Sequence, residues 1–419
     1  MHSELSPVTM YRLPWNLTDN AISWLEPTSA CNLYCDGCYR ENRKDSHKSL
    51  HAIGHELDVF EKYRKCDGVS IAGGEPLAHP DIVEIVRMVK RKGWKAIINS
   101  NGGLLTPELL RELKRAGADG FTFHVDSGQV RPQYKGCNEI ELNELRNKLA
   151  DMLHDVGGMT CSFNATVYPE TLHYVPALLQ WAQEKIDRVH VMVFINYRMA
   201  VMGKDVDFYI GDQQVRFDDM MYSKKDDHRR TDISSPEVVD VIRTQYPDFT
   251  PCAYLNGSES PDSYKWLMTG RMGNSRQIFG YVGPKFMEIV QTGNHLFTGK
   301  YLAYGSPAMQ RRGRLYSLLA PFDAGIRGVM KSWLGSLFRQ PAAFFKRIHF
   351  QSVMIIQPAD ILANGAVNMC DGCPDITVWN DQLVWSCRME EQLRWGQNVR
   401  MVPKRKAEKV EAEESSVHG

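Results

Sequence analysis

Between residues 22 and 196, short β-rich runs alternate with helical patterns, and this alternation constrains the fold more than any other feature. Six runs are typical of buried strands: AISWLE, GVSIA, KAIIN, FTFHVD, TCSFNATV and RVHVMVF. Helical stretches separate them, such as residues 79–93, whose apolar side chains recur at i, i+3, i+4 and i+7 from Ile82. Strands that alternate with helices in this way predict βα units around a parallel sheet.

Six such units are fewer than the eight of a closed TIM barrel. The sequence therefore predicts an α/β fold with a partial (βα)6 TIM-type barrel and a C-terminal, cysteine-containing extension. Residues 404–419 are charged and lack apolar anchors, which is typical of a disordered tail. The other expected divisions are an N-terminal segment at 1–21, the core at 22–200, an irregular, substrate-covering region at 201–300, a basic amphipathic segment at 301–350 and an auxiliary extension at 351–403.

Charge and composition exclude some classes of function. Lys plus Arg equals 50 and Asp plus Glu equals 50, so the net charge does not favour a nucleic-acid partner. No run of about 18 apolar residues predicts a spanning helix, and the N-terminus lacks a signal-peptide pattern. We therefore expect a cytoplasmic protein. Its ten cysteines are then expected to be thiols, metal ligands or redox groups rather than disulfides.

Cys31, Cys35 and Cys38 follow the first predicted strand with the spacing C-x3-C-x2-C. A zinc knuckle with a distant fourth ligand, or a redox CxxC of Cys35 and Cys38, would also use thiols. Neither alternative requires this spacing in a strand-to-helix loop. A four-iron cluster normally takes four thiolates, so three would leave one iron open to a ligand that is not protein.

The ends of the next three strands also carry distinctive motifs, where parallel sheets bind ligands. The second strand ends in GGEP, whose glycines let a ligand approach the backbone and whose carboxylate suits an ammonium group. These strand-end residues are Gly73, Gly74, Glu75 and Pro76, then Ser100 and Asn101, then Asp126, Ser127 and Arg131.

Together, these motifs resemble those of radical S-adenosylmethionine (SAM) enzymes over roughly residues 22–196. The resemblance implies that Cys31, Cys35 and Cys38 bind a [4Fe–4S] cluster whose open iron takes the methionine amino and carboxylate groups of SAM. It implies one-electron cleavage of SAM to methionine and a 5′-deoxyadenosyl radical that removes a hydrogen atom from the substrate. It also implies an electron donor of the flavodoxin or ferredoxin type.

The same resemblance implies roles for the other strand-end residues. Many family members have an aromatic residue directly before the third cysteine, where this chain has Gly37, so Tyr39 is the candidate for stacking on adenine. GGEP would bind the amino group of SAM, Ser100 and Asn101 would lie near its ribose and carboxylate, and Asp126, Ser127 and Arg131 would contact SAM or substrate.

A second cysteine group, Cys370, Cys373 and Cys387, lies near the C-terminus. By itself it fits a structural zinc site as well as an iron–sulfur cluster. Relatives in the resembled family often append an auxiliary cluster after the barrel, in twitch and SPASM extensions, which favours a second iron–sulfur cluster here. Its fourth ligand would be Cys252 or the substrate. The full seven-cysteine SPASM pattern is absent.

Residues 309–350 contain eight Arg and Lys residues and one acid, Asp323, interspersed with Leu, Phe, Trp and Met. Helices that pack on the core and expose a basic face are the simplest explanation. The alternative is an amphipathic surface that meets anionic lipid, or a cover over an apolar substrate.

The sequence supports three functions, and the motifs at consecutive strand ends favour the two enzymatic ones over the third. The first is a radical SAM enzyme that acts on an unactivated C–H bond of a small molecule or a lipid, with a peripheral membrane contact. The second is a radical SAM peptide or cofactor maturase. The third is a non-catalytic iron–sulfur or zinc protein for electron transfer or assembly. No general acid or base can be assigned.

Overall fold

A computed structural model describes residues 5–198, 206–216, 230–260, 263–339, 341–362 and 364–404. In these ranges, eleven strands form one sheet in the order β1-β10-β11-β13-β7-β6-β5-β4-β3-β2, with β12 paired to β11. The strands are β1 (Tyr11–Arg12), β2 (Ile22–Thr28), β3 (Gly68–Gly73), β4 (Lys95–Ser100), β5 (Gly120–His124), β6 (Thr160–Val167), β7 (Val191–Asn196), β10 (Ala253–Leu255), β11 (Trp266–Gly273), β12 (Ile278–Tyr281) and β13 (His349–Ile356).

The six predicted strands are β2 to β7, and they pair in sequence order, all parallel. A helix follows each of the first five: α1 (Leu50–Tyr63), α2 (Ile82–Arg91), α3 (Pro107–Ala116), α4 (Asn143–Val156) and α5 (Val175–Glu184). Local signals set their bounds. At α3, Thr106 caps the start by accepting from the Leu109 N–H, and Gly117 ends the helix with a φ of 102°. The α/β fold with a partial barrel-type sheet is thus confirmed.

The region after β7 corrects the expected divisions. Residues 201–300 are not generally irregular, because they contain α6 (Ser235–Arg243), β10, β11, β12 and α7 (Pro284–Thr298). β13 begins inside the expected basic segment and pairs parallel to β7, so it is a seventh parallel strand of the sheet. β11 then pairs antiparallel to β13, and nearly all of its residues are buried. This extension of the sheet explains why these segments are ordered.

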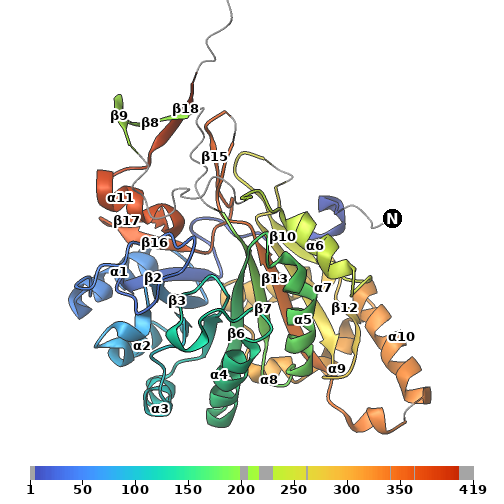
Figure 1. Cartoon of the computed structure of the whole chain (residues 1–419). Helices are drawn as coiled ribbons and strands as arrows, with labels where there is room; N and C mark the ends of the chain where they lie inside the picture. Colours follow the sequence, from blue (N-terminus) through green and yellow to red (C-terminus); the bar gives the residue numbers. More distant parts are fainter. Residues whose placement is uncertain are drawn as a thin grey trace, which may run out of the picture.

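Beyond β12, the expected basic segment folds mainly into helices: α8 (Pro307–Gln310), α9 (Gly313–Tyr316), α10 (Ala324–Arg339) and the 3-10 helices η5 (Ser317–Leu319) and η6 (Pro341–Phe345). The single acid, Asp323, is buried and accepts backbone N–H groups of Gly283, Phe286 and Ile326. In Figure 1, α10 lies beside β12 at the right of the molecule, whereas α1 and β2 lie at the left. In the described ranges, no helix has the length and apolar character needed to cross a bilayer.

The C-terminal residues return to the first strand of the barrel. The hairpin of β16 (Ile376–Trp379) and β17 (Gln382–Trp385) packs on β2 and α1, and α11 (Met389–Trp395) follows (Figure 1). The remaining pieces are small: β14 (Asp360–Ile361) pairs with β15 (Val367–Asn368), and β18 (Arg400–Pro403) pairs with β8 (Val206–Ile210), which pairs with β9 (Gln213–Val215). The tail expected at 404–419 lies outside the described residues, apart from Lys404.

Candidate active site at the strand ends

One cavity of about 580 Å³ receives both cysteine groups, although they are far apart in the sequence. It begins at the carboxyl ends of the parallel strands, where ligands of such sheets bind. Of the predicted site residues, these line it: Cys31, Cys35, Cys38, Tyr39, Gly73, Gly74, Ser100, Asn101, Cys370, Cys373 and Cys387.

The loop of the first cysteine group is held by the loop after β5. Cys35 pairs with Gln129 as an isolated antiparallel bridge. The Asp36 N–H donates to the Gly128 carbonyl at 2.9 Å, and the Val130 N–H donates to the Tyr34 carbonyl at 2.8 Å. These backbone contacts fix the position of Cys35 relative to the sheet.

N–H groups point at two of the three sulfurs. Cys31 Sγ accepts from the Leu33 backbone at 3.5 Å and from the Asn101 amide at 3.8 Å. Cys35 Sγ accepts from the Gln129 amide at 3.6 Å. Such donors stabilise a thiolate more than a thiol, and hydrogen bonds to the sulfurs help to set the potential of an iron–sulfur cluster.

Burial raises the pKa of the thiols of Cys31, Cys35 and Cys38, so without iron they keep their protons at neutral pH. Within the described ranges, no three or more His, Cys, Asp or Glu side chains form a group arranged to hold a metal ion. A four-iron cluster makes a different demand, because each thiolate binds a different iron. Three thiols on one cavity, with N–H donors aimed at two of the sulfurs, fit that demand.

The glycines of GGEP are required by a close approach of two loops. A Cβ on Gly73, whose φ is +103°, would lie 2.3 Å from the Thr28 carbonyl oxygen. A Cβ on Gly74 would lie 2.4 Å from the Ala30 carbonyl oxygen, directly before Cys31. The glycines therefore bring the β3 end against the cysteine loop and present bare backbone to the cavity.

The Glu75 carboxylate does not line the cavity, and its expected contact with the ammonium group of SAM stays a prediction. Glu75 is fully buried and accepts hydrogen bonds from Ser100 Oγ at 2.8 Å and from the backbone of Asn101 at 2.7 Å. Burial raises its pKa to about 7, against the opposing effect of these hydrogen bonds. Its carboxylate joins the ends of β3 and β4, while Pro76 is buried at the start of a 3-10 turn.

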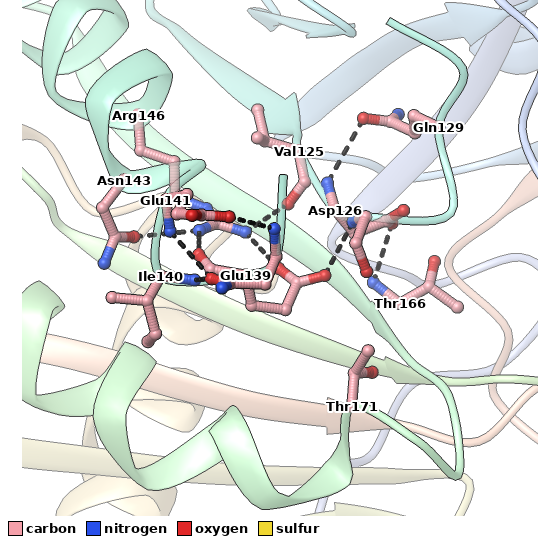
Figure 2. A network of polar contacts seen from close by, with 12 residues as sticks. Val125, Asp126, Gln129, Glu139, Ile140, Glu141, Asn143, Arg146, Thr166 and Thr171 are labelled. Carbon is pink, nitrogen blue, oxygen red and sulfur yellow. Dashed lines mark hydrogen bonds and ion pairs between the residues drawn. The ribbon is translucent and has the colours of Figure 1, made fainter. Parts of the chain in front are cut away.

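Asp126, Ser127 and Arg131 likewise do not line the cavity as the described residues form it, so their expected contacts with SAM or substrate are not supported. Asp126 is buried and accepts from the backbone of Gly128 and Thr166, both at 3.0 Å (Figure 2). Arg131 donates to the carbonyls of Asn101 and His124. These polar side chains build the loop that carries Gln129.

A buried ion pair supports the same loop from behind. Figure 2 shows Arg146 of α4 against Glu139, with 2.6 Å between Arg146 Nη2 and Glu139 Oε2. Glu139 also accepts the Ser127 N–H at 2.7 Å, and Arg146 donates to the Val125 carbonyl. A chain of contacts thus runs from α4 through the β5 loop to Cys35.

Gly37 makes room for an aromatic ring from another strand. A Cβ on Gly37 would lie 2.8 Å from the Tyr197 ring, which comes directly after β7 and lines the cavity. Tyr39 also lines the cavity, and its hydroxyl is hydrogen-bonded to Ser386. Two aromatic residues therefore border the cysteine loop, and sequence reasoning found only Tyr39.

The second cysteine group is gathered by the C-terminal hairpin. The thiols of Cys370 and Cys373 are hydrogen-bonded, which raises the pKa of Cys373 together with burial. Burial and the neighbouring Cys370 raise the pKa of Cys387 to about 12. Asp375 lies in the same part of the cavity, and burial raises its pKa to about 7. The structure thus brings three thiols and one carboxylate together.

Cys252 does not join this group, so its assignment as the fourth ligand is wrong. It is 1% exposed within the second core cluster, and its thiol donates to the Met268 carbonyl at 3.3 Å. The strand pairing of β10 and β11 holds it inside the sheet edge.

A buried network links the two cysteine loops. Arg40, two residues after Cys38, pairs with Glu26 at 2.6 Å, and both side chains are buried. Arg40 also donates to the carbonyl of Ser386, directly before Cys387, at 2.6 Å. The Ser386 hydroxyl completes the ring by donating to Glu26 at 2.7 Å.

The cavity extends from the cysteines along the inside of the sheet. Its apolar wall includes Val191, Val193 and Ile195 of β7 and Phe350, Met354 and Ile356 of β13. Six residues of strand correspond to about 20 Å. Residues of α7, α8 and α9 complete this wall: Phe286, Met287, Val290, Met309 and Tyr316.

The strands on the other side of β7 from β13 give the cavity a polar wall. Asn99 of β4, Thr122 of β5 and Asn164 of β6 line it. The Asn99 side-chain nitrogen and the Asn164 side-chain oxygen are buried and have no hydrogen-bond partner among the described residues. Unpaired buried polar atoms are costly, so this wall suits a ligand with polar groups. The cavity as a whole is amphipathic.

Sequence reasoning missed Glu26, Arg40, Gln129, Arg146 and Asp375. Only Arg40 and Asp375 had a usable signal, namely their place two residues after a clustered cysteine. The others are polar residues within predicted strands, loops or helices, and only the fold shows that they meet the cysteine loops.

Comparison with known proteins agrees with this geometry. Residues 25–182 match the family described as the Radical SAM superfamily. A tungsten-containing aldehyde ferredoxin oxidoreductase cofactor-modifying protein of Pyrococcus furiosus is 37% identical over 106 residues, which are 25% of this chain and 30% of that protein. An AdoMet-dependent heme synthase of Methanosarcina barkeri is 35% identical over 117 residues, 26% of this chain and 32% of that protein.

The chain thus spans about a third of the length of these two relatives. Among solved structures, Streptococcus suis SuiB is 17% identical, with a TM-score of 0.40 over 55% of this chain and 46% of that chain. The matched residues hold the first cysteine group, GGEP and five of the parallel strands in full or in large part. Residues 25–182 of this chain form a radical SAM domain.

Proposed function

We propose that this protein is a radical SAM enzyme that removes a hydrogen atom from an unactivated C–H bond of an amphipathic, lipid-like substrate. The observation that supports it most directly is the single cavity that joins the first cysteine group to an apolar wall about 20 Å long. A bound [4Fe–4S] cluster would supply the electron that cleaves SAM, and SAM would supply the radical that abstracts hydrogen.

In this proposal, Cys31, Cys35 and Cys38 hold the cluster, and the donors on Cys31 and Cys35 stabilise their thiolates. The backbone of Gly73 and Gly74 forms the floor beside SAM, and Glu75 fixes that floor by clamping β3 to β4. Ser100 and Asn101 line the cavity next to Cys31 and suit the polar groups of SAM.

The substrate's apolar part would lie along β7 and β13, where the cavity wall lacks charge. Its polar part would meet Asn99 and Asn164, whose unpaired atoms gain hydrogen bonds from it or from SAM. Enclosure by these walls excludes water from a reactive radical.

Cys370, Cys373 and Cys387 would hold a second iron–sulfur cluster, with a zinc site as the alternative. Because Cys252 is held elsewhere, the fourth position would be filled by Asp375 or the substrate. A flavodoxin- or ferredoxin-type protein would donate the electron.

A peripheral membrane contact belongs to the same proposal. All eight Arg and Lys residues between 309 and 350 are exposed, while the acid Asp323 is buried, so the exposed charge of this segment is positive. Large apolar side chains accompany it: Phe338 and Phe345 are 91% and 86% exposed. Basic and apolar side chains on one surface favour anionic bilayers, and Met309 and Tyr316 of this segment also line the cavity.

The test measures 5′-deoxyadenosine formed by the reconstituted, reduced protein with lipid extract in detergent, and then with the polar fraction of the same extract. We expect the lipid extract, and not its polar fraction, to increase the rate of 5′-deoxyadenosine formation. A Met354→Trp variant, which fills the apolar wall, should lose the stimulation but keep the unstimulated rate. Stimulation by the polar fraction alone would instead favour a small cofactor as substrate, as the names of the relatives suggest.

A further inference from the structure

A second, polar cavity lies on the face of the molecule that carries α10. Its volume is about 400 Å³, and it lies between the turn that joins β11 to β12 and the C-terminal half of α10. The turn contributes Asn274, Arg276 and Gln277, with Phe279 of β12 beside them; the helix contributes Ser332, Gly335, Ser336 and Arg339; Lys346 follows η6. No motif identified in the sequence includes these residues as a group.

Three cations line this cavity, and no acid does. Arg276, Arg339 and Lys346 form no ion pair with any carboxylate in the described ranges, although many surface Arg and Lys residues of this chain do. Three like charges around one hollow repel one another. An anion in the hollow would relieve that repulsion.

The helix presents its side of the cavity as a regular stripe. Ser332, Gly335, Ser336 and Arg339 are spaced i, i+3, i+4 and i+7, so they share one face of α10. A Cβ on Gly335 would meet no atom within 4 Å, so the hollow extends to the helix backbone. On the other side, Asn274 accepts the N–H groups of Arg276 and Gln277, which fixes the turn.

Apolar side chains directly adjoin the cations in sequence. Phe338 precedes Arg339, and Phe345 precedes Lys346, and both rings are almost fully exposed. A free phosphate would have no use for exposed rings at the rim of its site. A phosphate attached to acyl chains would place the chains next to them.

We propose that this cavity binds the phosphoryl headgroup of an anionic phospholipid through Arg276, Arg339 and Lys346. Guanidinium forks recognise phosphate oxygens, and a lysine ammonium adds a further charged donor. The inference rests on the proposed membrane contact and gives it a specific headgroup site, separate from the cavity that holds the cysteines.

Two glycine substitutions in α10 test the site without changing charge. Both glycines face open space, so a larger side chain fits at either position. Gly335→Leu fills the cavity, whereas Gly328→Leu, seven residues earlier, lies outside it. Both replace a helical glycine and should not weaken the helix. We measure binding of the reconstituted full-length protein to phosphatidylglycerol–phosphatidylcholine vesicles, to pure phosphatidylcholine vesicles, and to soluble glycerol phosphate.

We expect wild type and Gly328→Leu to bind the anionic vesicles with similar affinity, and Gly335→Leu to bind them about tenfold more weakly. Equal binding by both variants overturns the headgroup site but leaves a diffuse basic membrane surface. Tight binding of glycerol phosphate without vesicle binding overturns the proposal that the bound phosphate belongs to a lipid. No binding to any probe overturns the site and the membrane contact. SAM cleavage, measured in parallel, reports on the proposed radical chemistry independently.

Discussion

Arg40 donates a hydrogen bond of 2.6 Å to the carbonyl of Ser386, and so joins the residue two places after Cys38 to the residue directly before Cys387. Glu26 accepts hydrogen bonds from both Arg40 and the Ser386 hydroxyl. The two cysteine loops are therefore not independent, because one buried ion pair sets their separation. This separation would govern electron transfer between two clusters.

We expect Arg40→Met to leave Glu26 buried without its cation, which costs about 3–5 kcal/mol of folding free energy. It should also release the C-terminal loop, so that reconstituted protein keeps the first cluster but loses iron from the second. Arg43→Met is the matched control, because Arg43 pairs with Glu41 and Glu390 but is 43% exposed. Chemical denaturation and iron content measure the two effects. Full iron content in Arg40→Met would show that the link is dispensable for cluster assembly.

The two cysteine groups should differ in what they support. Cys35→Ala is expected to abolish SAM cleavage, because the first cluster is lost. Cys373→Ala should leave SAM cleavage intact but prevent product formation. Cys137→Ala, outside both groups, should behave as wild type. Iron and sulfide analysis with Mössbauer spectra should give about eight irons in wild type and about four in either cluster variant; about four in wild type would make the C-terminal group a zinc or structural site.

Tyr197 should contribute to SAM affinity through its ring. We expect Tyr197→Ala to raise the Kd for SAM by roughly 5- to 150-fold, because base–aromatic stacking contributes about 1–3 kcal/mol. Tyr39→Ala is the comparison, since Tyr39 also borders the cysteine loop. Equilibrium binding of SAM to the cluster-loaded variants measures how much each of the two rings contributes. A larger effect of Tyr39→Ala would favour Tyr39 as the adenine contact.

His190 should make the fold sensitive to acid. It is 4% exposed, its Nδ1 accepts the Cys161 N–H at 3.0 Å, and burial, reinforced by Arg311, lowers its pKa to about 3. Below pH 6.5 the unfolded chain binds a proton that the folded chain does not, so stability falls as the pH drops toward 3.

The expected slope from this residue is about 1.4 kcal/mol per pH unit. His190→Asn keeps an acceptor for Cys161 but removes the titration, so its unfolding free energy should change less between pH 7 and about pH 5. Urea denaturation of the metal-free chain at the two pH values measures this difference. An unchanged slope would mean that His190 titrates normally in the folded chain.

Much of the barrel could be predicted because its signals are local. The strands β2 to β7 are short apolar runs, and helices such as α3 carry their own start and stop at Thr106, Pro107 and Gly117. The cysteine groups and GGEP were also visible as spacings. β13 was not, because its pairing with β7 depends on a partner far earlier in the chain.

The predicted site residues that the structure places outside the cavity lining share one physical feature. Glu75 and Asp126 are polar and follow strands, as ligand-binding residues do, but both are buried and their oxygens accept hydrogen bonds from neighbouring loops. Cys252 is a cysteine like the residues of the second group, but the fold holds it away from them, where its thiol donates to a backbone carbonyl. A sequence pattern shows which side chains reach a sheet edge, and it does not show which of them the fold uses for its own hydrogen bonds.

The late insertion of β13 has a consequence for how the chain is made. Until residues 349–356 leave the ribosome, the edge of β7 keeps unpaired N–H and C=O groups, which can recruit a strand from another chain. Nascent or truncated chains that end shortly after β7 should therefore aggregate, even though they contain the first cysteine group. The C-terminal half covers the β7 edge as well as carrying its own cysteines, so we expect the six-strand core to need it for solubility.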